Sequence, residues 1–120
     1  MKNKGRTDPN KVTLIRILRR AAAKNEAKIW TILASEMSKA NRRRVAINVS
    51  RLNRVSSPGD ILLIPGKVLG TGSLNHKLEV AAESFSTTAQ MKIDNAGGQC
   101  LTIEELLNRN PTGSRIRLIK

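Results

Sequence analysis

A short apolar run near the middle of the chain, Ile61-Leu62-Leu63-Ile64, places the strongest constraint on the fold. Four consecutive apolar residues, with β-branched side chains among them, are typical of a strand that is buried on both faces. The turn-forming pair Pro65-Gly66 follows at once, and such pairs commonly end a strand. We therefore expect a buried strand that stops at Pro65-Gly66 and on which the rest of the chain packs.

A loop punctuated by glycines is expected after this strand, with Lys67, His76 and Lys77 among its few polar side chains. Residues 78–82 form a second apolar segment and predict another strand. Glycines at these spacings indicate a loop whose backbone must approach another group closely.

A helix ending at Asn95 is expected next, with Ser84 or Ser86 as its N-cap. Ala89 and Ile93 are four residues apart and share one face of this helix. The pair Gly97-Gly98 is typical of a helix end.

The first helix is expected to begin at Pro9, because proline suits the first helical turn, with Thr7 or Asp8 as its cap. One face of this helix is apolar and the other is basic. The apolar face holds Leu14, Ile15, Leu18, Ala21 and Ala22, and the basic face holds Arg16, Arg19, Arg20 and Lys24.

A second helix is expected over residues 27–39, with Trp30 as a core anchor rather than a base-stacking platform. Its other inward-facing residues are Ile29, Leu33 and Met37. A strand over residues 45–49 and a short helix capped by Ser50 precede a turn at residues 57–60.

The last part of the chain predicts a strand over residues 99–101 and a helix that starts with a capping box, Thr102 with Glu105. Apolar and basic residues alternate over residues 114–119, as in a half-exposed edge strand. Strands alternating with capped helices indicate an α/β fold, with N-terminal helices packed on an irregular strand–helix–strand layered core. We expect a basic N-terminal arm over residues 1–7 and a single domain over 8–120, divided into a helical part (8–44) and an α/β core (45–120).

The net charge of +13 indicates a polyanionic partner. Residues 1–60 carry 15 Lys and Arg against 4 Asp and Glu, so most of the positive excess lies in the first half. Aromatic residues make up only 2% of the chain, which leaves few rings on which single-stranded bases could stack. The remaining mode of nucleic-acid binding is contact with phosphates combined with shape readout of structured RNA.

Several other functions lack the residues that they need. Gly66-Lys67 is not a phosphate loop, because the earlier glycine and the following Ser or Thr are missing. One histidine and one cysteine, Cys100, give no metal site and no nucleophile with a base, and we expect a small buried thiol. No membrane span or signal peptide is visible. We therefore expect that the protein is not an enzyme and uses no cofactor or metal. We also expect that it binds neither a small-molecule substrate nor a membrane, and that it is cytoplasmic.

A long gapped pattern resembles the signature of large-subunit ribosomal protein eighteen-e and of its bacterial relative, ribosomal protein fifteen. The pattern runs through Lys67-Val68-Leu69-Gly70, Gly72, Leu74, Leu78, Val80, Phe85-Ser86, Ala89, Ile93 and Gly97. Ile29-Trp30, Asn41 to Arg44, Asn48-Val49 and Asn110-Pro111-x-Gly113-Ser114 are similar to the archaeal branch. The resemblance implies an irregular α/β core behind an N-terminal helical part.

The resemblance also implies a structural role in the large ribosomal subunit, with large-subunit ribosomal RNA and neighbouring ribosomal proteins as partners. A small architectural, chromatin-like DNA-binding protein is the alternative, although no apolar wedge or groove-entering helix supports it. We expect the adjacent arginines Arg42, Arg43 and Arg44 to be the best local RNA site. The candidate RNA-binding residues are Lys2, Lys4, Arg6, Arg16, Arg19, Arg20, Arg42, Arg43, Arg44, Lys67, His76 and Lys77.

Overall fold

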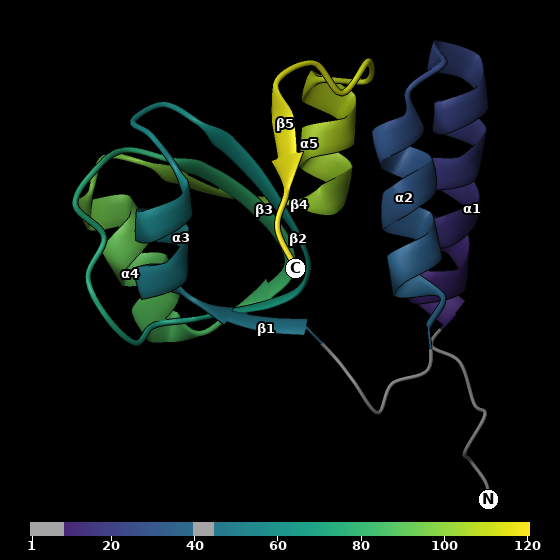
Figure 1. Ribbon diagram of the computed structural model, residues 1–120. Coiled ribbons are helices and arrows are strands. Elements are labelled where there is room, and N and C mark those ends of the chain that lie inside the picture. Colours follow the sequence, from purple (N-terminus) through teal and green to yellow (C-terminus); the bar gives the residue numbers. More distant parts are fainter. Residues whose placement is uncertain (1–8, 40–44) are drawn as a thin grey trace, which may run out of the picture.

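The computed structural model describes residues 9–39 and 45–120 of the chain, which form an α/β arrangement (Figure 1). A pair of helices comes first, and strands then alternate with shorter helices. In chain order the elements are α1 (Pro9–Asn25), α2 (Lys28–Met37), β1 (Val45–Asn48), α3 (Val49–Val55), β2 (Ile61–Leu69), β3 (Glu79–Phe85), α4 (Thr87–Asn95), β4 (Gln99–Thr102), α5 (Ile103–Arg109) and β5 (Ile116–Leu118).

The strands pair in parallel around β2 as the central strand. One edge of β2 pairs with β3, which in turn pairs with β4. The other edge is shared, because β5 pairs with residues 61–63 and β1 with residues 66–69. The C-terminal strand therefore completes the sheet beside the part of β2 that β1 leaves free.

Helices cover both faces of the sheet and create two separate hydrophobic clusters (Figure 1). Leu63 of β2 faces α1, α2 and α5, and its neighbours Leu62 and Ile64 face α3 and α4. All three side chains are fully buried. The prediction of a strand buried on both faces is confirmed.

The prediction that this strand ends at Pro65-Gly66 is wrong, because β2 continues to Leu69. Pro65 has no N–H to offer a neighbouring strand, and it lies where the register with β3 shifts between Ile64 and Lys67. Gly66 is buried against β1, where a Cβ atom would lie 2.1 Å from the carbonyl oxygen of Val45. The pair is a bulge inside the sheet, and Lys67 consequently belongs to the strand and not to the loop.

The paired N-terminal helices have the predicted faces. Leu18 and Ala22 of α1 are buried together with Trp30 and Leu33 of α2. The Trp30 ring is fully buried, and its Nε1–H donates to the carbonyl oxygen of Pro111 over 2.8 Å, which confirms it as a core anchor. The predicted caps of α1, the N-terminal arm and the boundary between the helical part and the α/β core lie outside the described residues.

Three of the helix starts can be compared with the predicted caps. Ser86 caps α4 by accepting from the N–H of Ala89 over 3.1 Å, and Thr102 and Glu105 form the predicted capping box of α5. The expected cap of the short helix is wrong, because α3 begins at Val49 with Asn48 before it, and Ser50 lies inside the helix. Asn48 makes no cap contact there; its side chain accepts instead from the N–H of Thr71.

Candidate nucleic-acid interface

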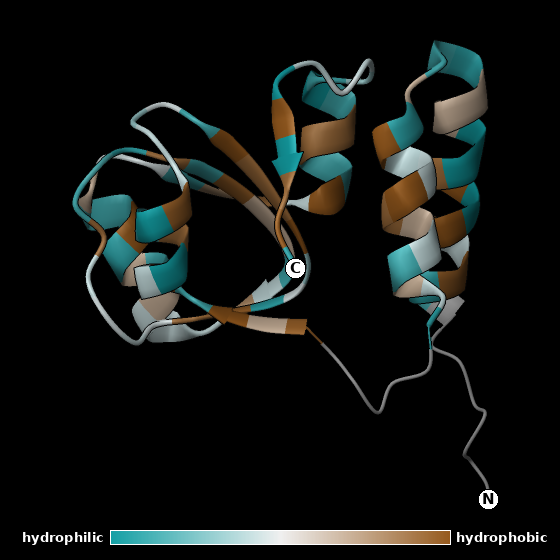
Figure 2. Cartoon of the chain, in the orientation of Figure 1, coloured by the Kyte–Doolittle hydropathy of each residue, from teal (hydrophilic) through white to brown (hydrophobic). Residues whose placement is uncertain are grey.

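The outward face of α1 carries a line of basic side chains. Arg16, Arg20 and Lys24 follow one another at intervals of four residues, so they lie along one side of the helix. All three are exposed, as is Arg19 beside them. Hydrophilic residues accordingly occupy the outer side of α1, whereas hydrophobic residues face α2 (Figure 2).

These charges are largely without partners among the described residues. Arg19 donates to the hydroxyl oxygen of Ser38 over 3.5 Å, which is a weak contact. Within the described residues, Arg16, Arg20 and Lys24 make no hydrogen bond or ion pair. Like charges one turn apart repel each other, and an external anion would relieve this repulsion. We refer to the exposed residues Arg16, Arg19, Arg20 and Lys24 as the α1 basic face.

Lys67 lies on an uncovered part of the sheet. The register places it between Ala46 of β1 and Ser84 of β3, and all three residues are exposed. The next residue, Val68, is fully buried in the cluster beneath α3 and α4, so Lys67 points away from that cluster. Small neighbours on both sides leave its ammonium group open to a phosphate.

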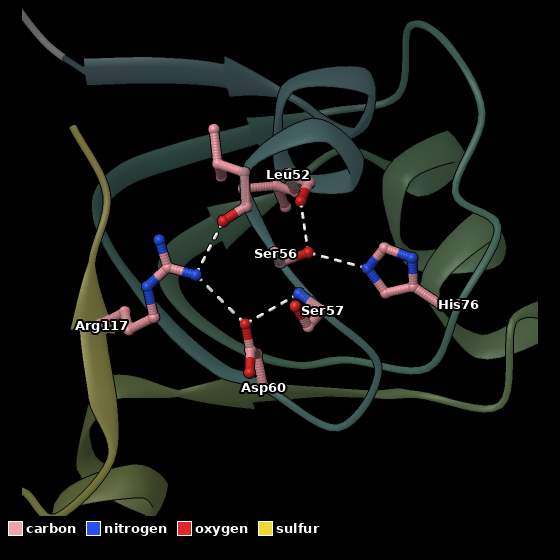
Figure 3. A network of polar contacts seen from close by, with 7 residues as sticks. Leu52, Ser56, Ser57, Asp60, His76 and Arg117 are labelled. Carbon is pink, nitrogen blue, oxygen red and sulfur yellow. Dashed lines mark hydrogen bonds and ion pairs between the residues drawn. The ribbon is translucent and has the colours of Figure 1, made fainter.

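His76 and Lys77 lie in the loop over residues 70–78, and only one of them is free. The Lys77 side chain is exposed and makes no hydrogen bond or ion pair with the part of the chain that the structure describes. His76 is half-buried, and its Nε2 atom lies 2.8 Å from the hydroxyl oxygen of Ser56 (Figure 3). Ser56 donates its one hydroxyl proton to the carbonyl oxygen of Leu52, so Nε2 of His76 must carry the proton and donate.

Arg117, beside this contact, fastens β5 to the end of α3 and to the turn that follows it (Figure 3). Arg117 donates to the carbonyl oxygen of Val55 over 2.7 Å and to the Asp60 carboxylate over 3.1 Å. The pKa of Asp60 is lowered, first by the N–H of Ser57, 2.9 Å from the carboxylate, and then by Arg117. Arg117 therefore stabilises the fold through contacts within the protein.

Other basic residues are also engaged within the protein. Arg51 donates to the carbonyl oxygen of Lys120, and Arg109 to the side chain of Gln99. Glu36 of α2 pairs with Lys120 and with Lys39, and these two contacts lower its pKa. The exposed cations of this chain therefore differ in whether an internal acceptor engages them, and their charge alone does not reveal this difference.

The structure thus separates the candidate residues into groups. The α1 basic face lies on one side of the sheet, and the loop with His76 and Lys77 is held against α3 on the other side (Figure 1). Lys24 joins the candidates, since it continues the line that the helical spacing already indicated. Lys2, Lys4, Arg6, Arg42, Arg43 and Arg44 lie outside the described residues.

The described residues contain no group of three His, Cys, Asp or Glu side chains that could hold a metal ion. Burial, with a smaller effect of the Asp94 charge, raises the pKa of the Cys100 thiol to about 11, so the thiol is protonated near neutral pH. In the same residues no helix is long and apolar enough to cross a membrane. What the surface offers is exposed cationic side chains that can contact phosphates.

Comparison with known proteins gives matches over nearly the whole chain. The model of a family described as "Ribosomal protein 60S L18 and 50S L18e" matches residues 2–120. Large ribosomal subunit protein eL18 of Methanococcus maripaludis is 49% identical over 113 residues, which is 94% of each chain. The protein of the same name from Archaeoglobus fulgidus is 46% identical over 95% of this chain and 97% of its own. That from Methanothermobacter thermautotrophicus is 43% identical over 96% and 95%.

Proposed function

The chain belongs to the family of ribosomal proteins 60S L18 and 50S L18e, and on this premise we propose that the α1 basic face is its main contact with large-subunit ribosomal RNA. As a member of this family it is a structural constituent of the large ribosomal subunit and not an enzyme. Its place is therefore on the ribosome, among ribosomal RNA and other ribosomal proteins.

The observation that carries the proposal is the absence of internal partners for Arg16, Arg20 and Lys24 within the described residues. Arginine presents a planar fork of donors that suits phosphate oxygens. Each phosphate that such a side chain neutralises releases condensed counterions from the RNA, which favours binding at low salt. The charges of Arg117 and Lys120 are instead partly neutralised within the protein by the Asp60 and Glu36 carboxylates.

Further contacts are proposed for Lys67 and Lys77, which are exposed on β2 and in the loop after it. Chain connectivity supports a contribution from two basic segments outside the described residues. Residues 1–8 join α1 at Pro9, and residues 40–44 join Lys39 to Val45. Because α1 and α2 pack side by side in opposite directions, these two junctions lie at the same end of the helix pair (Figure 1).

The mode of recognition follows from the lack of free aromatic rings. Trp30 is fully buried and Phe85 packs against the cluster beneath α3 and α4, so neither is a stacking platform for unpaired bases. Cationic side chains that contact phosphates suit folded RNA, which proteins recognise largely by shape. We therefore propose that the protein binds the phosphate backbone of folded ribosomal RNA and does not recognise a single-stranded sequence.

The test is a salt titration of binding to a folded fragment of large-subunit ribosomal RNA. In the double variant Arg16→Gln with Arg20→Gln, the slope of log affinity against log salt should fall in magnitude by about 1 to 2, since each lost contact removes somewhat less than one unit. The matched control is Arg51→Gln with Arg109→Gln, which removes the same charge from exposed side chains that already donate to acceptors within the protein.

An unchanged slope in the α1 variant, or an equal fall in the control, would contradict the proposal. Duplex DNA of the same length, added as competitor at matched salt, tests the alternative of a DNA-binding protein. We expect it to compete poorly with the ribosomal RNA fragment.

A further inference from the structure

Lys92 of α4 holds the loop that follows β2, through contacts with residues 20 and 22 positions earlier in the chain. Its ammonium group donates to the carbonyl oxygens of Gly70 and Gly72, each over 2.6 Å. The side chain is half-buried, and two of its three donors are used by these contacts. This cation is therefore directed at the protein backbone, unlike Lys67 and Lys77.

The same loop is fastened from the opposite side by α3 and the residue before it. The N–H of Thr71 donates to the side chain of Asn48 over 3.3 Å, and the N–H of Ser50 donates to the carbonyl oxygen of Thr71 over 3.1 Å. Farther along, the N–H of Asn75 donates to the side chain of Asn53 over 2.9 Å. The contact between His76 and Ser56 completes the series.

The glycines of the loop make this double attachment possible. A Cβ atom on Gly70 would lie 2.6 Å from the side chain of Thr88 at the start of α4, and one on Gly72 would lie 2.3 Å from Cβ of Ser50. Gly72 also has a φ of +95°, which side chains disfavour. The groups that the glycine backbone approaches closely thus belong to α3 and α4.

We propose that Lys92 is a positioning residue for RNA binding: by joining α4 to the carbonyl groups of Gly70 and Gly72, it holds the loop in the form in which Lys77 meets the RNA backbone, and it makes no RNA contact itself. The proposal rests on the function proposed above. A loop that is ordered before binding loses little conformational freedom when the RNA arrives, and this preorganisation increases affinity.

The substitution Lys92→Met keeps the length of the side chain and removes its donors. We expect affinity for the ribosomal RNA fragment to fall about tenfold, as estimated from the cost of ordering a few side chains and a loop, while the salt slope stays at its original value. The amides of Thr71 and Asn75 should exchange hydrogen faster in the free protein. Lys92→Arg, which keeps donors at this place, should recover most of the affinity.

Two further variants provide controls. Lys77→Met removes a proposed phosphate contact, so its salt slope should fall in magnitude by about 1. Asn53→Ala releases the same loop from the α3 side without changing any charge, and it should lower affinity in the same way as Lys92→Met. It also provides the test if Lys92→Met does not fold.

Two outcomes would overturn the inference. A salt slope reduced by about 1 in Lys92→Met would show that Lys92 contacts phosphate directly. Unchanged affinity together with faster exchange in the loop would show that the loop lies outside the interface. Neither outcome depends on the α1 double variant, so failure of this inference and failure of the proposed function can be told apart.

Discussion

Replacement of Gly66 by alanine tests the packing at the centre of the sheet, because two opposing effects make predictions of opposite sign. Gly66 does not have a positive φ, and at such positions alanine normally stabilises a protein by about 0.4–1 kcal/mol through the unfolded chain. Here, however, the new Cβ atom would lie 2.1 Å from the carbonyl oxygen of Val45 and 2.8 Å from its carbonyl carbon. Ordinary contact begins at 3.4 Å.

The obstruction is a backbone group of β1, which cannot rotate away as a side chain would. Val45 must move by more than an ångström, and its pairing with Gly66 is the first of the four register pairs between β1 and β2. Overpacking of a core typically costs about 1–3 kcal/mol. Taking the upper part of that range and subtracting the entropic gain leaves a net destabilisation of about 2 kcal/mol.

Thermal unfolding of the free protein measures this effect. With about 2.1 cal/mol/K of unfolding entropy per residue over 120 residues, a loss of about 2 kcal/mol lowers Tm by about 8 °C. Hydrogen exchange should be faster at the amide of Ile47 in β1. Gly97→Ala is the control, since Gly97 has open space and a φ of +84°, and it should leave β1 protected. An unchanged or raised Tm in Gly66→Ala would refute the reasoning.

Three further predictions concern a helix, a basic segment and a carboxylate. Ala89→Leu should lower stability by about 1–3 kcal/mol, since Ala89 is fully buried; an unchanged Tm would contradict this packing. Replacing Arg42 to Arg44 together by Gln should reduce the salt slope of RNA binding by about 2 to 3 without a large change in Tm. Glu36 has a lowered pKa through Lys120 and Lys39, so its contribution to stability is present above its unfolded pKa and is lost as the pH falls through the folded value. Tm should therefore fall less steeply on acidification in Glu36→Gln than in the unchanged protein.

Much of the fold follows from signals that are local in the sequence. The apolar run at residues 61–64, the spacing of Ala89 and Ile93 and the capping box of Thr102 with Glu105 each rest on contacts within a few residues. All three are confirmed in β2, α4 and α5. The basic face of α1 is also a local signal, because helical periodicity alone brings its residues to one side of the helix.

Long-range contacts account for what could not be predicted. Pro65-Gly66 has the composition of a turn, and the pair remains in β2 because β1 packs against Gly66. Lys92 and Arg117 likewise resemble ordinary surface cations, yet their partners lie 20 to 62 residues away. No local pattern indicates such partners, so the sequence could not separate the cations that hold the fold from those that are free to bind RNA.

The most direct test of the central claim is cleavage of ribosomal RNA by a hydroxyl-radical probe attached to α1. Ala23→Cys provides an exposed attachment point among the basic residues of α1 without removing a charge. Cys100 should react slowly, since its pKa is raised to about 11 and the thiolate is the reactive form. Asn108→Cys, exposed on α5, is the matched control, and the unsubstituted protein gives the background. In reconstituted large subunits we predict strong cleavage of the ribosomal RNA from position 23 and weak cleavage from position 108; strong cleavage from position 108 with none from position 23 would contradict the account.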